Sequence, residues 1–164
     1  MQTTEPVLGC RDLGIAVPGR RLVDGLDLEI TPGDFLAVLG QNGAGKTLTL
    51  HTLAGLRPNA GTVRLHGRDL ASLRRSEIAA RLSLLPQDVD DVFPATVLET
   101  VLVGRHPHIA AFEWESAADR QIARDALGRV GLADFAEREI DTLSGGERRR
   151  VAIAQVLAQA PALY

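Results

Sequence analysis

The stretch FLAVLGQNGAGKTLTL, residues 35–50, decides the fold. Its apolar start, residues 35–39, predicts a short strand buried on both faces. The segment GQNGAGKT, residues 40–47, matches the pattern G-x-x-x-x-G-K-[ST], and the apolar residues from Lys46 to Leu56 predict a mostly buried helix that ends at Gly55 or at the turn of residues 58–59. Strand, glycine-rich turn and helix follow in the order that a phosphate-binding loop requires.

The residue types in this loop suit the binding of a nucleotide. Glycines let the backbone curl so that successive N–H groups point at an anion. Lys46 is the only lysine of the chain, and its ammonium can reach the β- and γ-phosphates, whereas the Thr47 hydroxyl can hold Mg²⁺. The alternative is a turn with a solvated lysine, but the flanking elements favour phosphate. The expected nucleotide-binding residues are Gly40, Gln41, Asn42, Gly43, Ala44, Gly45, Lys46, Thr47 and Leu48.

Composition bounds the class of protein. The chain has 164 residues, of which 45% are hydrophobic and 24% charged, with a formal net charge of −3. These values fit a globular domain and give no electrostatic reason to expect nucleic acid as a partner. Cys10 is the only cysteine, which excludes an intrachain disulfide and fits a reducing compartment. No leader and no run of ~18 apolar residues is present, so we expect a cytosolic protein.

The remaining pattern predicts a mixed α/β fold. Alternating apolar residues predict antiparallel strands over 7–17 and 22–30, with further strands over 62–66 and 82–85. Capping residues precede three helical stretches, which begin after Thr96, Ser116 and Ser144, and glycines at 104 and 131 are expected to end the first two.

The second informative motif is LSGGE, residues 143–147. After a phosphate-binding loop it resembles the signature sequence of the ATP-binding cassette (ABC) family, and LSGGERRRVAIAQVLAQ continues the resemblance. A guanine-recognition motif N-K-x-D is impossible because Lys46 is already used. The resemblance implies a P-loop NTPase (RecA-like) core with an antiparallel β subdomain and a helical signature lobe, incomplete at the C-terminus. The expected division is a core and β subdomain over about 1–88, a helical lobe over about 89–143, and the signature helix with the start of a further strand over 144–164.

Two glycines weaken the start of the signature helix by about 1 kcal/mol each. They remove side chains where a phosphate would approach the backbone. The resemblance implies that Ser144, Gly145, Gly146 and Glu147 contact the γ-phosphate of ATP held by a second copy, so a homodimer is expected. The alternative is an ordinary capping box of Ser144 and Glu147. At least two of the arginines at 148, 149 and 150 are expected to be solvated or to face a partner.

Gln87 falls where the ABC family places its Q-loop glutamine. The resemblance implies that Gln87, with Lys46, belongs to the catalytic residues and that Gln87 joins Thr47 in holding Mg²⁺. The segment from about 88 to 112 would lie against a membrane partner, and its stretch FPATVLETVLVGRHPH resembles ATPases of importers for iron siderophores, haem or cobalamin. His106 and His108 have no third ligand nearby, which favours a structural role over a metal site.

The chain also departs from the family pattern. Val17 and Pro18 stand where an aromatic residue usually stacks on adenine, and the chain ends before the strand with the Walker B aspartate, the catalytic glutamate and the switch histidine. We therefore expect the 164 residues alone to bind nucleotide weakly without hydrolysing it.

The resemblance implies that the full-length protein is an ATPase of an importer on the cytoplasmic face of the inner membrane. Its cofactors would be ATP and Mg²⁺. Its partners would be a second ATPase subunit, permease subunits and, indirectly, a substrate-binding protein. Two alternatives stay open: a truncated, hydrolysis-incompetent nucleotide-binding remnant, and an ABC ATPase outside transport. Among the latter, the DNA-repair type would need a coiled-coil or zinc insertion, and the translation type two cassettes in one chain.

Overall fold

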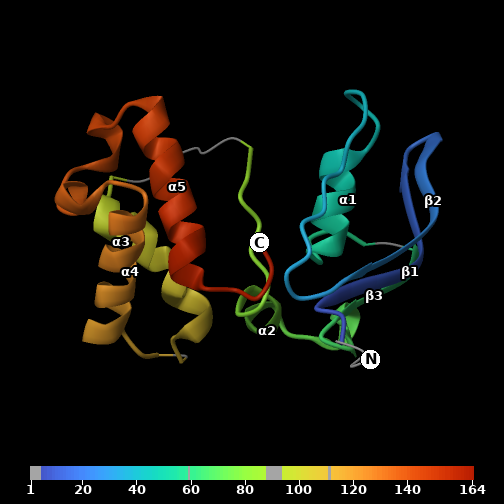
Figure 1. Ribbon diagram of the computed structural model, residues 1–164, viewed down its shortest axis with the longest axis horizontal. Coiled ribbons are helices and arrows are strands. Elements are labelled where there is room, and N and C mark those ends of the chain that lie inside the picture. Colours follow the sequence, from blue (N-terminus) through green and yellow to red (C-terminus); the bar gives the residue numbers. More distant parts are fainter. Residues whose placement is uncertain (1–4, 59, 88–93, 111) are drawn as a thin grey trace. The chain divides into compact units, whose positions relative to one another are not determined.

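The structure of the protein is a computed structural model that describes residues 5–58, 60–87, 94–110 and 112–164. The chain forms two compact units, Met1–Ile78 and Ala79–Tyr164, drawn in Figure 1. Each unit is described by itself. Within the described residues, no helix combines the length and the apolar character needed to cross a membrane. The functional division at about residue 88 stays a prediction.

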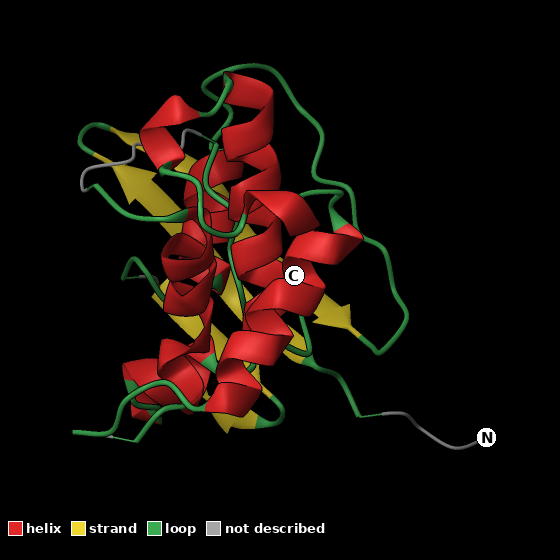
Figure 2. Ribbon diagram, turned by 90° about the vertical axis from the view of Figure 1, so that its left-hand side faces the viewer, coloured by secondary structure: helices red, strands yellow, loops and turns green. Residues whose placement is uncertain are grey.

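The first unit is built on an antiparallel sheet of four strands in the order β2-β1-β3-β4, drawn as yellow arrows in Figure 2. The predicted strands over 7–17, 22–30 and 62–66 are thus confirmed. Alternation in the first of them buries Leu8 and Cys10 and, after an irregularity at residues 11–12, Leu13 and Ile15. The strands are β1 (Leu8–Val17), β2 (Arg20–Ile30), β3 (Ala60–Leu65) and β4 (Arg68–Asp69), and a 3₁₀ turn η1 (Leu70–Ser72) and helix α2 (Arg75–Ala79) follow them.

The helix after the glycine-rich loop is α1 (Lys46–Leu53), which contacts β1. Gly55, just after the helix, terminates it: its φ of 72° lets the Leu56 N–H reach the His51 carbonyl at 2.8 Å in a Schellman motif. The buried face differs from the expected one. Thr52 and Leu53 are buried, together with Thr49 and Ala54, but Leu50 and Leu56 are 42% and 55% exposed. The threonines can be buried because their hydroxyls donate to carbonyls one turn back, at 2.7 and 3.0 Å.

The predicted strand over 35–39 is wrong: these residues are in no strand, and Phe35 and Leu39 are 96% and 88% exposed. A strand exists only through pairing with neighbours, and none of the strands among the described residues pairs with this run. The predicted strand over 82–85 is reduced to one parallel bridge between Leu82 and Leu163. Both errors concern apolar runs that depend on distant partners.

The second unit is helical, and the capping residues at 96, 116 and 144 begin its helices as predicted. Three helices pack on one another around a core of leucine, valine and alanine, which includes Val97, Val101, Leu127 and Val151. Its elements are α3 (Val97–Leu102), a 3₁₀ segment η2 (Val103–His108), α4 (Ala117–Arg129), the short 3₁₀ turns η3 (Ala133–Phe135) and η4 (Ile140–Thr142), and α5 (Gly145–Gln159).

Candidate nucleotide site

The glycine-rich loop curls through positive φ angles, and its lysine lies across it. Gly40, Gly43 and Gly45 have φ values of 155°, 80° and 96°. The Lys46 ammonium donates to the carbonyls of Gly40 and Gln41 at 2.7 and 2.9 Å. The ammonium is therefore held over the loop rather than extended into water, and the predicted glycine and lysine residues do come together.

The N-terminus of α1 is open to an anion. Its N-cap, Gly45, supplies no side-chain hydrogen bond, and the first turn carries no acidic residue. A Cβ at Gly45 would lie 3.1 Å from the Leu22 Cβ, and the positive φ would add strain, so this position suits glycine. In contrast, α3, α4 and α5 each have a complete capping box. The first N–H groups of α1 are thus left for a ligand, and the exposed Thr47 lies among them.

The N-terminus of α5 caps itself. The Ser144 hydroxyl and backbone N–H donate to the Glu147 carboxylate at 2.6 and 2.7 Å. The Ser144 hydroxyl bond, and then its backbone bond, lower the pKa of Glu147, so this group is charged at neutral pH. A Cβ at Gly145 or Gly146 would meet no atom within 4 Å, and neither residue has a positive φ. Neither packing nor backbone conformation among the described residues explains the two glycines.

Gln87 is fixed by a residue that sequence reasoning did not assign. The Arg149 guanidinium donates from one nitrogen, Nη1, to the carbonyls of Pro86 and Gln87, at 2.5 and 3.1 Å. Arg150 donates to the Val130 carbonyl at 3.4 Å. Both arginines are exposed, yet each donates to a backbone carbonyl of its own unit. The prediction of a solvated or partner-facing cluster did not include these bonds.

The predicted site residues fall into two groups. The glycine-rich loop and Thr47 lie in the first unit, whereas Gln87 and Ser144 to Glu147 lie in the second. The joining of Thr47 and Gln87 at one Mg²⁺ stays a prediction. Val17, half-buried, and Pro18, exposed, lie at the turn between β1 and β2. Part of the expected membrane-facing segment, residues 88–93 and 111, falls outside the described residues.

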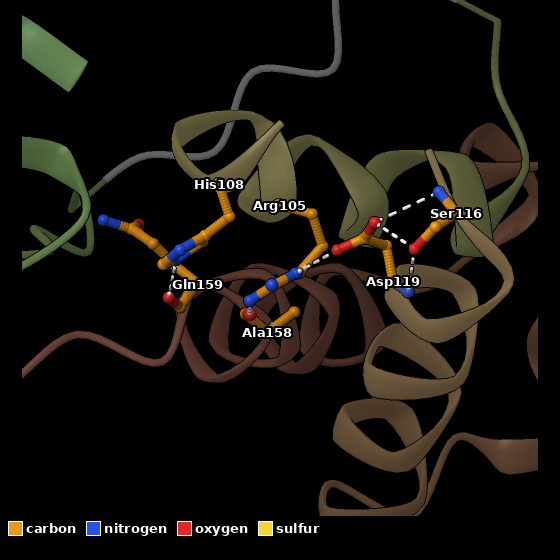
Figure 3. A network of polar contacts seen from close by, with 6 residues as sticks. All are labelled: Arg105, His108, Ser116, Asp119, Ala158 and Gln159. Carbon is orange, nitrogen blue, oxygen red and sulfur yellow. Dashed lines mark hydrogen bonds and ion pairs between the residues drawn. The ribbon is translucent and has the colours of Figure 1, made fainter. Parts of the chain in front are cut away.

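Side chains of the stretch GRHPH contact the last carbonyls of α5, as Figure 3 shows. The Arg105 guanidinium donates to the Ala158 carbonyl at 2.9 Å and to Asp119 Oδ1 at 2.9 Å. The His108 Nε2 lies 2.8 Å from the Gln159 carbonyl, so His108 has a structural partner. Within the described part of the chain, no group of three or more histidine, cysteine, aspartate or glutamate side chains is arranged so that it could hold a metal ion.

The glycine-rich loop that opens α1 and the helical lobe that carries the LSGGE motif together indicate a P-loop nucleotide-binding protein. The protein belongs to the ABC transporter family, whose model matches residues 23–164. It is 46% identical over 154 residues to the hemin import ATP-binding protein HmuV of Gloeobacter violaceus, covering 93% of this chain and 55% of that protein. It is 40% identical over 149 residues to the cobalamin import ATP-binding protein BtuD of Halobacterium salinarum, covering 90% of this chain and 37% of that protein.

Solved structures agree with this assignment. A transporter described as an ABC transporter of the metal-chelate type, in an inward-facing conformation, matches at a TM-score of 0.78 with 31% identity over 96% of this chain and 57% of that chain. The cbiO1 subunit of Clostridium perfringens matches at a TM-score of 0.79 with 25% identity, over 96% and 63% of the two chains. The predicted fold class is confirmed. The chain spans about half of the length of such relatives, 55% of HmuV from G. violaceus and 59% of HmuV from Deinococcus radiodurans.

Proposed function

We propose that this chain supplies the ATP-binding part of an importer ATPase subunit. The open N-terminus of α1, with the Lys46 ammonium held over its loop, is the observation that carries the proposal. Bare N–H groups and a fixed cation favour a polyanion, and a helix start without a carboxylate does not repel it. The residues fit a nucleoside triphosphate, whose phosphates Gly40 to Thr47 would bind. The Thr47 hydroxyl would hold Mg²⁺.

Hydrolysis in the full-length protein is the second part of the proposal. When bound, ATP with Mg²⁺ supplies the reacting phosphoryl group. Lys46 would stabilise the charge that develops on that group, and Gln87 would orient the attacking water or complete the Mg²⁺ shell. Thr47 and Gln87 offer neutral oxygens, which hold Mg²⁺ weakly and cannot act as a general base. We therefore propose that the 164 residues alone bind nucleotide weakly and do not hydrolyse it.

A dimer follows from the two unexplained glycines. Gly145 and Gly146 leave the start of α5 without side chains, and nothing within 4 Å would oppose a Cβ there. Glycines cost helix stability, so their presence suits a ligand that approaches the backbone. The γ-phosphate bound by the P-loop of a second copy is the ligand we propose. Ser144 would turn from Glu147 to that phosphate.

Haem, cobalamin or a related iron chelate is the proposed transported compound, because the relatives HmuV and BtuD are named for hemin and cobalamin import. The proposed partners are permease subunits in the membrane and, through them, a substrate-binding protein. The ATPase would then lie peripherally on the cytoplasmic face of the inner membrane. Uptake of haem and of cobalamin by proteoliposomes with the permease would separate the two substrates.

A nucleotide-binding measurement tests directly whether the open N-terminus of α1 and the Lys46 ammonium bind phosphate. We expect a fluorescent ATP analogue to bind the 164-residue chain, and Lys46→Ala to weaken binding at least tenfold because the fixed cation is lost. Arg57→Ala is the matched control, since it removes an exposed positive charge from the same unit. Equal affinity of wild type and Lys46→Ala, or an equal loss in both variants, would contradict the assignment.

A further inference from the structure

The backbone segment from Ala79 to Gln87 is hydrogen-bonded to α5 at two positions along the helix. Near the C-terminus of the helix, the Gln159 side-chain amide donates to the carbonyls of Ala79 and Leu82, and its oxygen accepts from the Ser83 hydroxyl at 2.7 Å. Nearer the N-terminus of the helix, Arg149 donates to the carbonyls of Pro86 and Gln87. The segment therefore runs antiparallel to the helix that carries the signature.

The two attachments hold the segment at points far apart along the helix. Arg149 and Gln159 are about ten residues apart, which is ~15 Å along the axis of an α-helix. Leu82 and Pro86 are four positions apart, over which a fully extended chain spans at most ~14 Å. The part of the segment near the C-terminus of α5 is also fixed by a backbone hydrogen bond, which the Ser83 N–H donates to the Leu163 carbonyl at 3.0 Å. A segment held at both ends cannot shift along the helix unless one attachment breaks.

We propose that Arg149 is a positioning residue for Gln87. It lies in the second turn of α5, five residues after the capping Ser144, and binds the backbone from which the Gln87 side chain projects. Gln87 and the start of the signature helix then move as one body. This inference rests on the proposed function, in which Gln87 serves ATP hydrolysis and Gly145 and Gly146 meet the nucleotide of a second copy.

Chemistry explains why an arginine suits this position. Both acceptors are main-chain carbonyls, so a donor without acceptor atoms is needed, and a guanidinium offers several N–H groups from one planar head. Bonds from a charged donor to a carbonyl are stronger than neutral ones. Lysine could make the same bonds with less fixed geometry, whereas leucine could make neither. Arg149→Lys is therefore the conservative variant and Arg149→Leu the disruptive one.

A double-mutant cycle in the full-length protein tests the inference. We expect Arg149→Leu to lower the kcat of ATP hydrolysis about tenfold with little change in KM, because nucleotide binding by the P-loop does not use this residue. In a Gln87→Ala background the same substitution should change kcat less than twofold, since the side chain that it positions is gone. Arg149→Lys should restore most of the kcat.

Arg150→Leu is the matched control, because it removes the same charge one residue away and breaks a bond to Val130 instead. Its effect, whatever its size, should be the same with Gln87 or alanine at 87. Hydrogen exchange of the peptide over residues 80–87 gives a readout free of activity: exchange should rise in Arg149→Leu and stay unchanged in Arg150→Leu.

The outcomes separate the two proposals. A wild-type full-length protein without ATP turnover refutes the proposed function. Turnover in the wild type, with additive effects of Arg149→Leu and Gln87→Ala, refutes the positioning role alone. Where Gln87→Ala leaves too little turnover to measure, unchanged hydrogen exchange in Arg149→Leu refutes it.

Discussion

Replacing Arg105 by methionine should destabilise the helical unit more than any surface charge does. The Arg105 guanidinium joins three elements, because it binds Asp119 at the start of α4 and the Ala158 carbonyl at the end of α5 from its own place in η2. The two side chains of the ion pair are only 11% and 14% exposed. Loss of one partner from a buried pair costs about 3–5 kcal/mol. Asp119 keeps its bonds to Ser116, so we expect a loss of about 2–3 kcal/mol in the free energy of unfolding.

The loss of unfolding free energy in Arg105→Met should shrink as the pH falls. The bond from the Ser116 hydroxyl and then the bond from Arg105 lower the pKa of Asp119 from 3.8 to about 2. A carboxyl with a lowered pKa in the folded state stabilises the protein above its unfolded pKa, and this contribution is lost as the pH falls from about 4 towards 2. The difference between wild type and Arg105→Met should therefore be largest above pH 4 and shrink towards pH 2.

Urea unfolding followed by circular dichroism at pH 7 and at pH 2.5 measures both quantities. Arg124→Met is the matched control, because its ion pair with Glu137 is 48% and 74% exposed and should contribute less than about 1 kcal/mol. A loss in Arg105→Met that is the same at both pH values would show that the methionine disturbs packing and that the ion pair contributes little. A loss no larger than that of Arg124→Met would refute the reasoning.

Three further predictions follow from single positions. Gly104→Ala should lower the free energy of unfolding by at least ~2 kcal/mol, because the new Cβ would clash with the Gln155 carbonyl. Gly128→Ala, which has open space around it, should be neutral or stabilising. Thermal melting compares the two variants. Gly55→Ala should cost about 1–2 kcal/mol in the same assay, since φ is 72° there. Glu147→Gln should tighten ATP-dependent dimerisation of the full-length protein several-fold in sedimentation experiments, because the charge that opposes a phosphate is removed.

The helices of the second unit could be predicted because their starts are local. In each capping box the hydroxyl and the carboxylate lie three residues apart, as with Thr96 and Glu99, so one short window of sequence contains both partners. The loop at Gly40 to Thr47 is predictable for the same reason. By contrast, the apolar run from Phe35 to Leu39 looks like a strand in isolation, but whether it pairs depends on strands far away in the sequence.

The contacts that hold Gln87 and the end of α5 could not be predicted. Arg149 reaches Pro86 across 63 residues, and Arg105 reaches Ala158 across 53 residues. In both cases the acceptor is a main-chain carbonyl, which every residue has, so no complementary residue type marks the partner. The stretch GRHPH resembles importer ATPases, and the structure gives two of its residues, Arg105 and His108, partners at the end of α5.

The two helix starts with glycines differ in charge, and under the proposed function this difference predicts an order of binding. The first turn of α1 has no carboxylate and carries Lys46, so no acidic side chain of that turn opposes a phosphate there. The start of α5 already holds the charged Glu147 carboxylate on Ser144, and a phosphate must replace it. Replacement of one anion by another yields little free energy, so in the proposed function α5 would have weak affinity for free nucleotide. The P-loop would then bind first, and the signature helix would engage only a phosphate that is already fixed in place.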